Sequence, residues 1–266
     1  MISKAKNYFK RNRNIVVQFV KRETASRYKG SYLGFLWSVL TPLLMLIVYT
    51  FVFGEIFQAK WHAESTNKLE YAVIIFAGLT TYNLFSEVVG RSPFLILSNT
   101  NYVKKVVFPL EVFPVIAVGS ALVNAAINFV LIAIFTVIVN HTLHWTVILL
   151  PIVILPLLFF TLGVSWLLSA LGVFLRDIGQ VIAIVIQALM LLSPILYSVD
   201  TIPLKFRWFY YLNPITYFVG DIRNVMIWGK VPILSIFVLE LLVSIIICVV
   251  GLFFFRKTKH GFADVM

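Results

Sequence analysis

Two carboxylates, Glu87 and Glu240, lie inside long apolar stretches of this 266-residue chain. An ionisable side chain in such a place is a functional candidate, because it can pair with a cation, relay a proton or face a pore. A carrier driven by protons or sodium usually needs several such groups. Two interpretations of Glu240 are therefore open: it forms a structural ion pair, or it faces a pore. The polar residues of the neighbouring apolar stretches are neutral, namely Asn124, Asn128, Thr161, Ser165, Ser169 and Gln187.

Motifs for phosphate, metal and nucleophilic chemistry are missing from the sequence. No G-x-x-x-x-G-K-[ST] loop occurs, so the chain has no recognisable cradle for ATP. His141 and His144 are three residues apart, but no Cys or His cluster gives them metal-site spacing. No Ser, His and Asp set is placed for nucleophilic work. We therefore expect neither an enzyme nor a cofactor or metal site in this chain.

The composition indicates an integral membrane protein. Hydrophobic residues make up 61% of the chain and charged residues 12%, whereas soluble domains are nearer half apolar and a quarter charged. The formal net charge of +11 would favour nucleic acid in a soluble protein. In a membrane protein, cytoplasmic loops rich in Lys and Arg explain such an excess, so no nucleic-acid partner is expected.

Apolar segments of about 20 residues, the length that crosses a bilayer, predict an all-α protein with six spans. Pro151 and Pro156 predict a kink in the fourth. Sixteen Lys and Arg fall on the side of the termini and six on the other side, which predicts cytoplasmic termini. The predicted spans are 34–55, 71–90, 113–139, 146–174, 179–198 and 231–255.

The basic run KRETASRYKG at residues 21–30 belongs to a longer amphipathic segment. Residues 5–29 can form a helix that lies in the membrane interface, with Lys and Arg on one face and apolar side chains on the other. Gly30 and Gly34 stand where the chain must turn into the first span. The alternative is an ordinary basic flank that only sets topology.

Two segments between spans are too apolar for simple loops. RSPFLILSNTNYVKKVVFPLEV at residues 91–112 starts with a helix-start signal and predicts a short helix on the cytoplasmic face. Residues 199–230 are rich in aromatics and contain the neighbouring pair Asp221 and Arg223. They predict two short helices that dip into the outer leaflet. The alternatives are a plain loop in the first case and an outer aromatic belt in the second.

The chain resembles the permease subunits of ABC-type polysaccharide exporters, above all those of the O-antigen class. The resemblance runs over nearly the whole sequence and rests on six motifs in family order. The motifs are KRETASRYKGSYLGFLWSVLTPLLMLIVYTFVFGEIFQAKW (21–61), NYVKKVVFPLEVFPV (101–115), LGVFLRDIGQ (171–180), LSPILYS (192–198), LNPIT (212–216) and KTKHGFADVM (257–266).

The resemblance implies one transmembrane domain over 1–266 in the bacterial cytoplasmic (inner) membrane. The chain would form a homodimer bound to two copies of an ATPase subunit, which alone would hold ATP and Mg²⁺. Residues 92–106 would be the coupling helix, with Asn101, Tyr102, Lys104 and Lys105 docking the ATPase. Arg176 and Asp177 would lie at the cytoplasmic gate, and residues 199–230 would form two re-entrant helices.

The implied cargo is a polysaccharide carried on undecaprenyl diphosphate. Because the diphosphate is anionic, Arg27, Tyr28 and Lys29 become candidates for its entrance. The pore or outer-gate candidates are Trp208, Tyr211, Tyr217 and Glu240. Teichoic acid or capsular polysaccharide is the alternative cargo, and a small-molecule or drug exporter is a further one.

Overall fold

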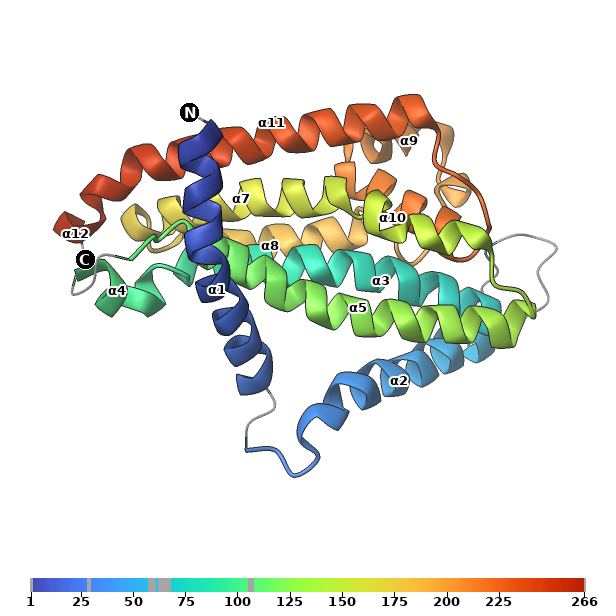
Figure 1. The fold of residues 1–266 in the computed structure, drawn as a ribbon. Coiled ribbons are helices and arrows are strands. Elements are labelled where there is room, and N and C mark those ends of the chain that lie inside the picture. The colour runs from blue at the N-terminus through green and yellow to red at the C-terminus, as the bar shows by residue number, and fades with distance from the viewer. Residues whose placement is uncertain (1, 28–29, 57–60, 62–67, 105–107, 266) are drawn as a thin grey trace.

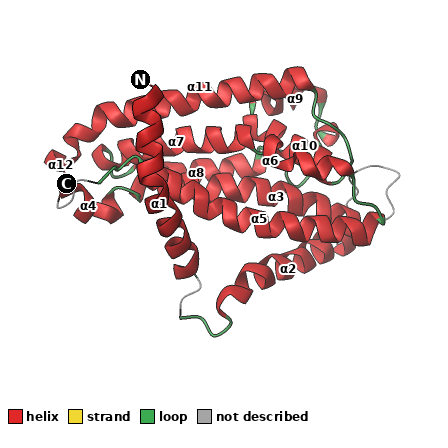
Figure 2. Cartoon of the chain, in the orientation of Figure 1, coloured by secondary structure: helices red, strands yellow, loops and turns green. Residues whose placement is uncertain are grey.

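The computed structural model describes residues 2–27, 30–56, 61, 68–104 and 108–265, and all secondary structure in these ranges is helical (Figures 1 and 2). Both termini lie near one end of the bundle, and α9 and α10 lie near the other (Figure 1). Following the charge-based orientation, we call these the cytoplasmic end and the outer end. The all-α membrane class predicted from composition is confirmed.

All six predicted spans are helical, but they differ in length. Four of the described helical runs are long and apolar enough to cross a membrane, and two are shorter. The 14 residues of α8 rise about 21 Å, less than a hydrocarbon core of about 30 Å. The long runs contain α3 (Lys68–Arg91), α5 (Val112–Asn140), α7 (Leu155–Phe174) and α11 (Leu234–Thr258), and the shorter ones are α2 (Trp37–Tyr49), continued by a π-helical turn, η2 (Thr50–Ile56), and α8 (Ile178–Leu191).

The fourth span, predicted to be tilted or kinked near its outer end, is interrupted there in the structure. The run starts with η5 (Trp145–Leu149) and α6 (Leu150–Val153), and Ile154 separates α6 from α7. Pro151 and Pro156 lack a backbone N–H, so each removes one bond of the helical ladder on either side of this break.

The basic N-terminal segment forms α1 (Ile2–Ser26), as predicted, and crosses the other helices at a steep angle in Figure 1. Its apolar side chains Val16, Phe19 and Val20 pack on the cytoplasmic part of the core. Gly30 and Gly34 have φ values of +88° and +50°, which glycine adopts without the steric cost of a Cβ. The predicted turn before α2 is therefore confirmed at both glycines.

The segment 92–106, which the resemblance implies to be the coupling helix, is broken into short helical pieces in the residues that the structure describes. The structure has η3 (Ser92–Phe94), η4 (Leu97–Asn99) and α4 (Thr100–Lys104), while residues 105–107 lie outside the described ranges. The Ser92 hydroxyl donates to the Val88 carbonyl, and the Asn99 amide donates to the Leu95 carbonyl. Such local side-chain bonds compete with the helical ladder, which explains the interruptions.

The outer segment contains η6 (Val199–Thr201) and the two predicted short helices, α9 (Leu204–Leu212) and α10 (Pro214–Met226). Asn213 caps α10 by accepting a hydrogen bond of 3.0 Å from the Ile215 amide, and Pro214 fits the first helical position. The fifth span ends at Leu191, earlier than the predicted 198.

Among the described residues, no ion pair joins Arg223 to its sequence neighbour Asp221. Its buried guanidinium donates to three backbone carbonyls and lies 4.4 Å from the Trp61 ring. These bonds join α10 to α3 and to the segment after α8, and they reach the carbonyls of Ile74 (3.0 Å), Pro194 (2.7 Å) and Ile195 (2.7 Å). A guanidinium has five donors, so it can satisfy several carbonyls at once.

The cytoplasmic end is closed by η1 (Gly34–Leu36) before α2 and by η7 (Lys259–Gly261) and α12 (Phe262–Val265) after α11. Phe262 is fully buried and packs edge-on against Phe255. The Lys259 ammonium donates to the Glu111 carboxylate at 2.6 Å, at the start of α5. The residues after the last span therefore fold back onto the bundle.

Candidate functional site

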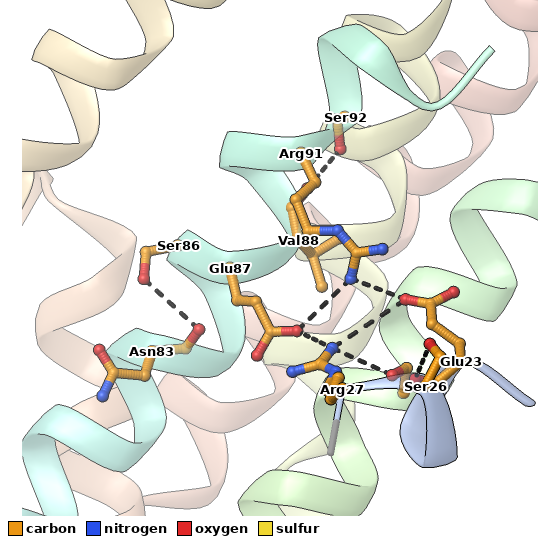
Figure 3. Close-up of polar contacts among 10 residues, drawn as sticks. Glu23, Ser26, Arg27, Asn83, Ser86, Glu87, Val88, Arg91 and Ser92 are labelled. Atoms are coloured by element: carbon orange, nitrogen blue, oxygen red, sulfur yellow. Dashed lines mark hydrogen bonds and ion pairs between the residues drawn. The ribbon is translucent and has the colours of Figure 1, made fainter. Parts of the chain in front are cut away.

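Four charged residues, Glu23, Arg27, Glu87 and Arg91, form what we call the charge network, between α1 and the cytoplasmic end of α3 (Figure 3). The Arg27 guanidinium pairs with Glu87 and also donates to the Ser120 hydroxyl at 3.0 Å. Arg91 lies 2.7 Å from Glu23 and 3.7 Å from Glu87. Each cation therefore faces both carboxylates.

The charge network is balanced and partly shielded from water. Its two guanidinium groups match its two carboxylates, and the side chains of Arg27, Glu87 and Glu23 are 23%, 28% and 22% exposed. Isolated surface ion pairs contribute little, but shared pairs with limited exposure hold their geometry better. The network thus fastens α1 to α3, and through Ser120 to α5.

A cavity of about 350 Å³, which we call the polar cavity, lies between α2, α3 and α5 beside the charge network. Glu87 belongs to both. The buried Asn124 Oδ1 and Thr80 Oγ1 have no hydrogen-bond partner among the described residues. The polar or aromatic lining residues are Trp37, Ser38, Thr41, Thr80, Asn83, Ser86, Glu87, Asn124 and Asn128.

The sequence indicated only part of this lining. Asn124 and Asn128 are four residues apart, which places them on one face of α5, and both line the polar cavity. Thr80, Asn83 and Glu87 were not recognised as a set, although steps of three and four residues place them on one face of α3. Ser165 instead joins helices, because its hydroxyl lies 2.7 Å from that of Ser92.

The predicted docking residues lie around α4. Asn101 is exposed, and the half-buried Tyr102 ring packs on Phe108 at 4.9 Å and Phe19 at 6.0 Å. Lys104 ends α4. Three predicted site residues, Tyr28, Lys29 and Lys105, lie outside the described ranges.

The predicted gate residues are split between the two ends of the bundle. Arg176 and Asp177 are exposed in the turn between α7 and α8. At the outer end, Tyr211, Tyr217 and Glu240 line one second cavity, and the Tyr217 hydroxyl donates to the Tyr211 carbonyl at 2.9 Å. Trp208 does not line it and is 60% exposed on α9.

Glu240 lies nearer the outer end than the sequence suggested. It is the seventh residue of α11, so it lies about 9 Å from the start of that helix rather than near its middle. Of the candidate carboxylates, Glu87 is paired at the cytoplasmic end, whereas the buried Glu240 Oε1 has no partner among the described residues.

The polar cavity suits an uncharged polar solute better than an ion. Hydroxyl and amide side chains dominate its wall, and each can donate and accept hydrogen bonds. The charged groups are confined to one side, where Arg27 and Arg91 meet Glu87. The chemical arrangement is therefore a neutral polar chamber with cations beside it.

Comparison with known proteins identifies the family. The model of the ABC-2 type transporter family matches residues 16–227. The chain is 31% identical over 255 residues to an O-antigen export system permease protein RfbA of Klebsiella pneumoniae, with 95% of each chain covered. It is 30% identical over 190 residues to the protein of that name from Myxococcus xanthus, covering 71% of this chain and 70% of the relative.

A more distant relative is the polysialic acid transport protein KpsM of Escherichia coli, 23% identical over 223 residues, with 79% of this chain and 80% of the relative covered. The family match covers most of the chain and includes α2 to α10, which carry the polar cavity. The chain therefore belongs to the ABC-2 type transporter family, as a multi-pass membrane permease.

Proposed function

We propose that this chain is the membrane-spanning subunit of an ATP-driven exporter that moves undecaprenyl-diphosphate-linked polysaccharide across the cytoplasmic membrane. O-antigen is the first candidate cargo. The relatives named O-antigen export system permease support this choice, since one of them aligns over 95% of both chains. ATP and Mg²⁺ would bind to a separate ATPase subunit.

The observation that carries the proposal is the polar cavity next to the charge network. A polysaccharide is rich in hydroxyl groups, which exchange hydrogen bonds with Asn, Ser and Thr side chains. Trp37 adds an aromatic face to the same wall. A translocating glycan thus finds partners without the desolvation cost that isolated buried charges would bring.

The lipid diphosphate would bind beside this chamber. Arg27 and Arg91 already bind the carboxylates of Glu23 and Glu87. A diphosphate would displace these carboxylates, replacing one charge-assisted contact by another. In this proposal the charge network is the resting form of the entrance, and Tyr28 and Lys29 extend it along the chain.

The assembly we propose has two copies of this chain and two ATPase subunits. All six apolar helices would span the membrane with cytoplasmic termini, and α1 would lie in the interface. The segment 92–106 would dock the ATPase through Asn101, Tyr102, Lys104 and Lys105. Arg176 and Asp177 would border the cytoplasmic gate, while Trp208, Tyr211, Tyr217 and Glu240 would border the outer gate.

Export in cells tests the cargo. A bacterium that lacks its own O-antigen export permease receives this chain with its cognate ATPase subunit, and surface O-antigen is measured by gel and antibody. We expect surface O-antigen to return with the pair and not with either subunit alone. Lipid-linked O-antigen that stays inside, with both subunits present in the membrane, would contradict the proposal.

Capsular polysaccharide is the second candidate, because the polysialic acid transport relative matches 79% of this chain. The same experiment in a strain that lacks its capsule permease separates the two cargoes. Restored capsule without restored O-antigen would favour the capsular assignment. A drug exporter would restore neither and would instead lower the accumulation of a fluorescent hydrophobic dye.

A further inference from the structure

A second cavity, which we call the α10–α11 cavity, opens at the outer end on the side of the bundle away from α2. Its volume is about 440 Å³, within the range of about 300–1,000 Å³ that small-molecule sites occupy. Its wall is formed by Phe160, Tyr211, Leu212, Pro214, Tyr217, Phe218, Ile236, Leu239, Glu240, Val243, Ser244 and Ile247.

Most of this wall is apolar, but two polar atoms in it are unsatisfied. Glu240 Oε1 and Ser244 Oγ are buried and have no hydrogen-bond partner among the described residues. They stand four residues apart, on one face of α11. Ser244 is 1% exposed and still lines the cavity. Buried polar groups are nearly always hydrogen-bonded, so this pair indicates a partner that comes from outside the chain.

The charge around the cavity specifies the sign of that partner. None of the described residues that line it is basic. Asp221 on α10 is a second carboxylate at this end of the bundle, and its Oδ2 is also buried without a partner among the described residues. The Tyr217 hydroxyl already donates its proton to the Tyr211 carbonyl, so it can only accept. An ammonium group, with three N–H donors and no acceptor, complements acceptors of this kind.

The exposed residues at the mouth of the cavity indicate that the rest of the ligand is apolar. Leu212, Leu239 and Tyr211 at its rim are 73%, 62% and 52% exposed, whereas Phe218 in its wall is 2% exposed. A ligand would thus enter from the apolar surface of the helices. A zwitterionic lipid headgroup would bring a phosphate close to the Glu240 carboxylate, and this repulsion favours a molecule with net positive charge.

We propose that the α10–α11 cavity binds a small amphiphilic amine, with its ammonium group on Glu240 and Ser244 and its apolar part between α7, α10 and α11. The bound amine would bridge α10 of the outer segment to α11. This site is separate from the polar cavity, because the two share none of their lining residues. Tyr211, Tyr217 and Glu240 are also the proposed outer-gate residues, so the test below reads binding of the amine itself and not export.

Photo-crosslinking tests this site in the full chain with its ATPase partner, reconstituted in nanodiscs of phosphatidylcholine and phosphatidylglycerol. The probe is a diazirine-bearing octylamine, and the matching octanol is its uncharged control. We expect the amine to label peptides from 211–218 and 236–247, and the alcohol to label them at least about tenfold less, since a charge-assisted hydrogen bond is lost. Equal labelling by both probes would overturn the proposal.

Labelling of substituted proteins is the second test of this site. Glu240→Gln keeps the side-chain size and should lower labelling about tenfold, whereas Asp200→Asn, an exposed outer carboxylate, should leave it unchanged. Val243→Trp narrows the mouth and should block labelling even if Glu240→Gln fails to fold. Wild-type labelling in Val243→Trp would refute the site. Displacement by phosphatidylethanolamine at equal mole fraction would refute the preference for a cationic amine.

Discussion

At the scale of single residues, the Arg27 side chain has one structural role and one proposed binding role. Its guanidinium joins α1 to α3 through Glu87, and the proposed function requires the same group to bind a lipid diphosphate. The place of Arg27 at the end of the basic helix, just before the turn at Gly30, could be predicted from the sequence. Its partners could not be predicted, because Glu87 is 60 residues away in the chain and only packing brings the two together.

Substitution at Arg27 should lower export in a graded way. Arg27→Lys keeps the charge but loses the forked contacts to Glu87 and Ser120, so export should fall less than in Arg27→Ala. Export of lipid-linked polysaccharide at matched membrane levels measures this. Lys21→Ala removes an exposed cation from the same helix and is the control.

A double-mutant cycle of Arg27→Ala with Glu87→Ala, read from thermal unfolding, should give a coupling of about 1 kcal/mol. Additive effects would show that the pair contributes nothing to the fastening of α1. Parental export in both position-27 variants would mean that the basic run serves orientation alone.

Arg223 should be intolerant even of lysine. A lysine ammonium cannot reach the carbonyls of Ile74, Pro194 and Ile195 with the same planar geometry, so at least one buried carbonyl loses its donor. We expect Arg223→Lys to cost about 2 kcal/mol. The measurement is the unfolding temperature in detergent, with Arg207→Lys, on the more exposed α9, as the control. An unchanged midpoint for Arg223→Lys would contradict the structural role.

At the scale of elements, the sequence predicts a helix well where the length of an apolar stretch determines it. The prediction is poor where hydrogen bonds to residues distant in the chain determine where a helix ends. The six apolar stretches, the kink at Pro151 and Pro156, and the two helices of the outer segment follow from composition and local signals. The breaks after Arg91 do not follow from local signals alone, because Ser92 also bonds to Ser165 of α7, 73 residues away, whereas the bond from Asn99 to Leu95 is local. The sequence contains no local sign of the first bond.

The contact between α7 and α11 depends on two glycines. A Cβ on Gly163 would lie 2.5 Å from the Ile247 carbonyl, and one on Gly251 would lie 2.1 Å from the Gly163 carbonyl. Small residues let transmembrane helices approach this closely. Gly163→Val or Gly251→Val should therefore separate the helices and lower the unfolding temperature and the membrane level.

Gly220→Ala is the matched control, because a Cβ at this position would meet nothing within 4 Å and α10 is helical there. Its stability should equal or slightly exceed that of the parent. Equal stability of the two valine variants and this control would show that α7 and α11 can pack in another way.

The Glu111 contact makes the cytoplasmic end sensitive to acid. Burial alone would raise the pKa of Glu111, but the hydrogen bond and charge of Lys259 and the charge of Arg256 outweigh it and lower the pKa below 4.5. The ionised Glu111 carboxylate therefore stabilises the folded protein fully at a pH above its ordinary pKa. This stabilisation is lost as the pH falls through the lowered pKa that Glu111 has in the folded protein.

Unfolding temperatures measured from about pH 7 to about pH 4 should show this loss. Glu111→Gln should have a lower unfolding temperature than the parent at neutral pH. Its unfolding temperature should also fall less on acidification, because the glutamine side chain does not titrate. Parallel pH curves for the parent and Glu111→Gln would contradict the role of this carboxylate.

At the scale of the whole molecule, the polar cavity depends on three helices that are far apart in the chain. Asn124 and Asn128 could be predicted to share a face of α5, but the opposing Thr80 and Asn83 of α3 depend on how the helices pack. Family resemblance predicted the function class, and the match over residues 16–227 confirms the family.

Docking of the ATPase subunit should depend on the basic end of α4. Reversal of charge at Lys104 and Lys105 should weaken co-purification of the ATPase subunit while membrane insertion stays intact, because many other cytoplasmic cations maintain the topology. Affinity purification from membranes measures the ratio of the two subunits. Lys257→Glu, in the last turn of α11, is a control for charge reversal at the same end. An unchanged ratio in the double variant would exclude this surface as the dock.

The fold-back after α11 also has a consequence for biosynthesis. Lys259 and Phe262 follow every span in the chain, yet they complete the surface formed by the start of α5 and the end of α7. A ribosome releases these residues only after all the spans, so the cytoplasmic end stays unfinished until late in translation. A chain cut short after its last span would lack these contacts and would leave the start of α5 and the end of α7 uncovered.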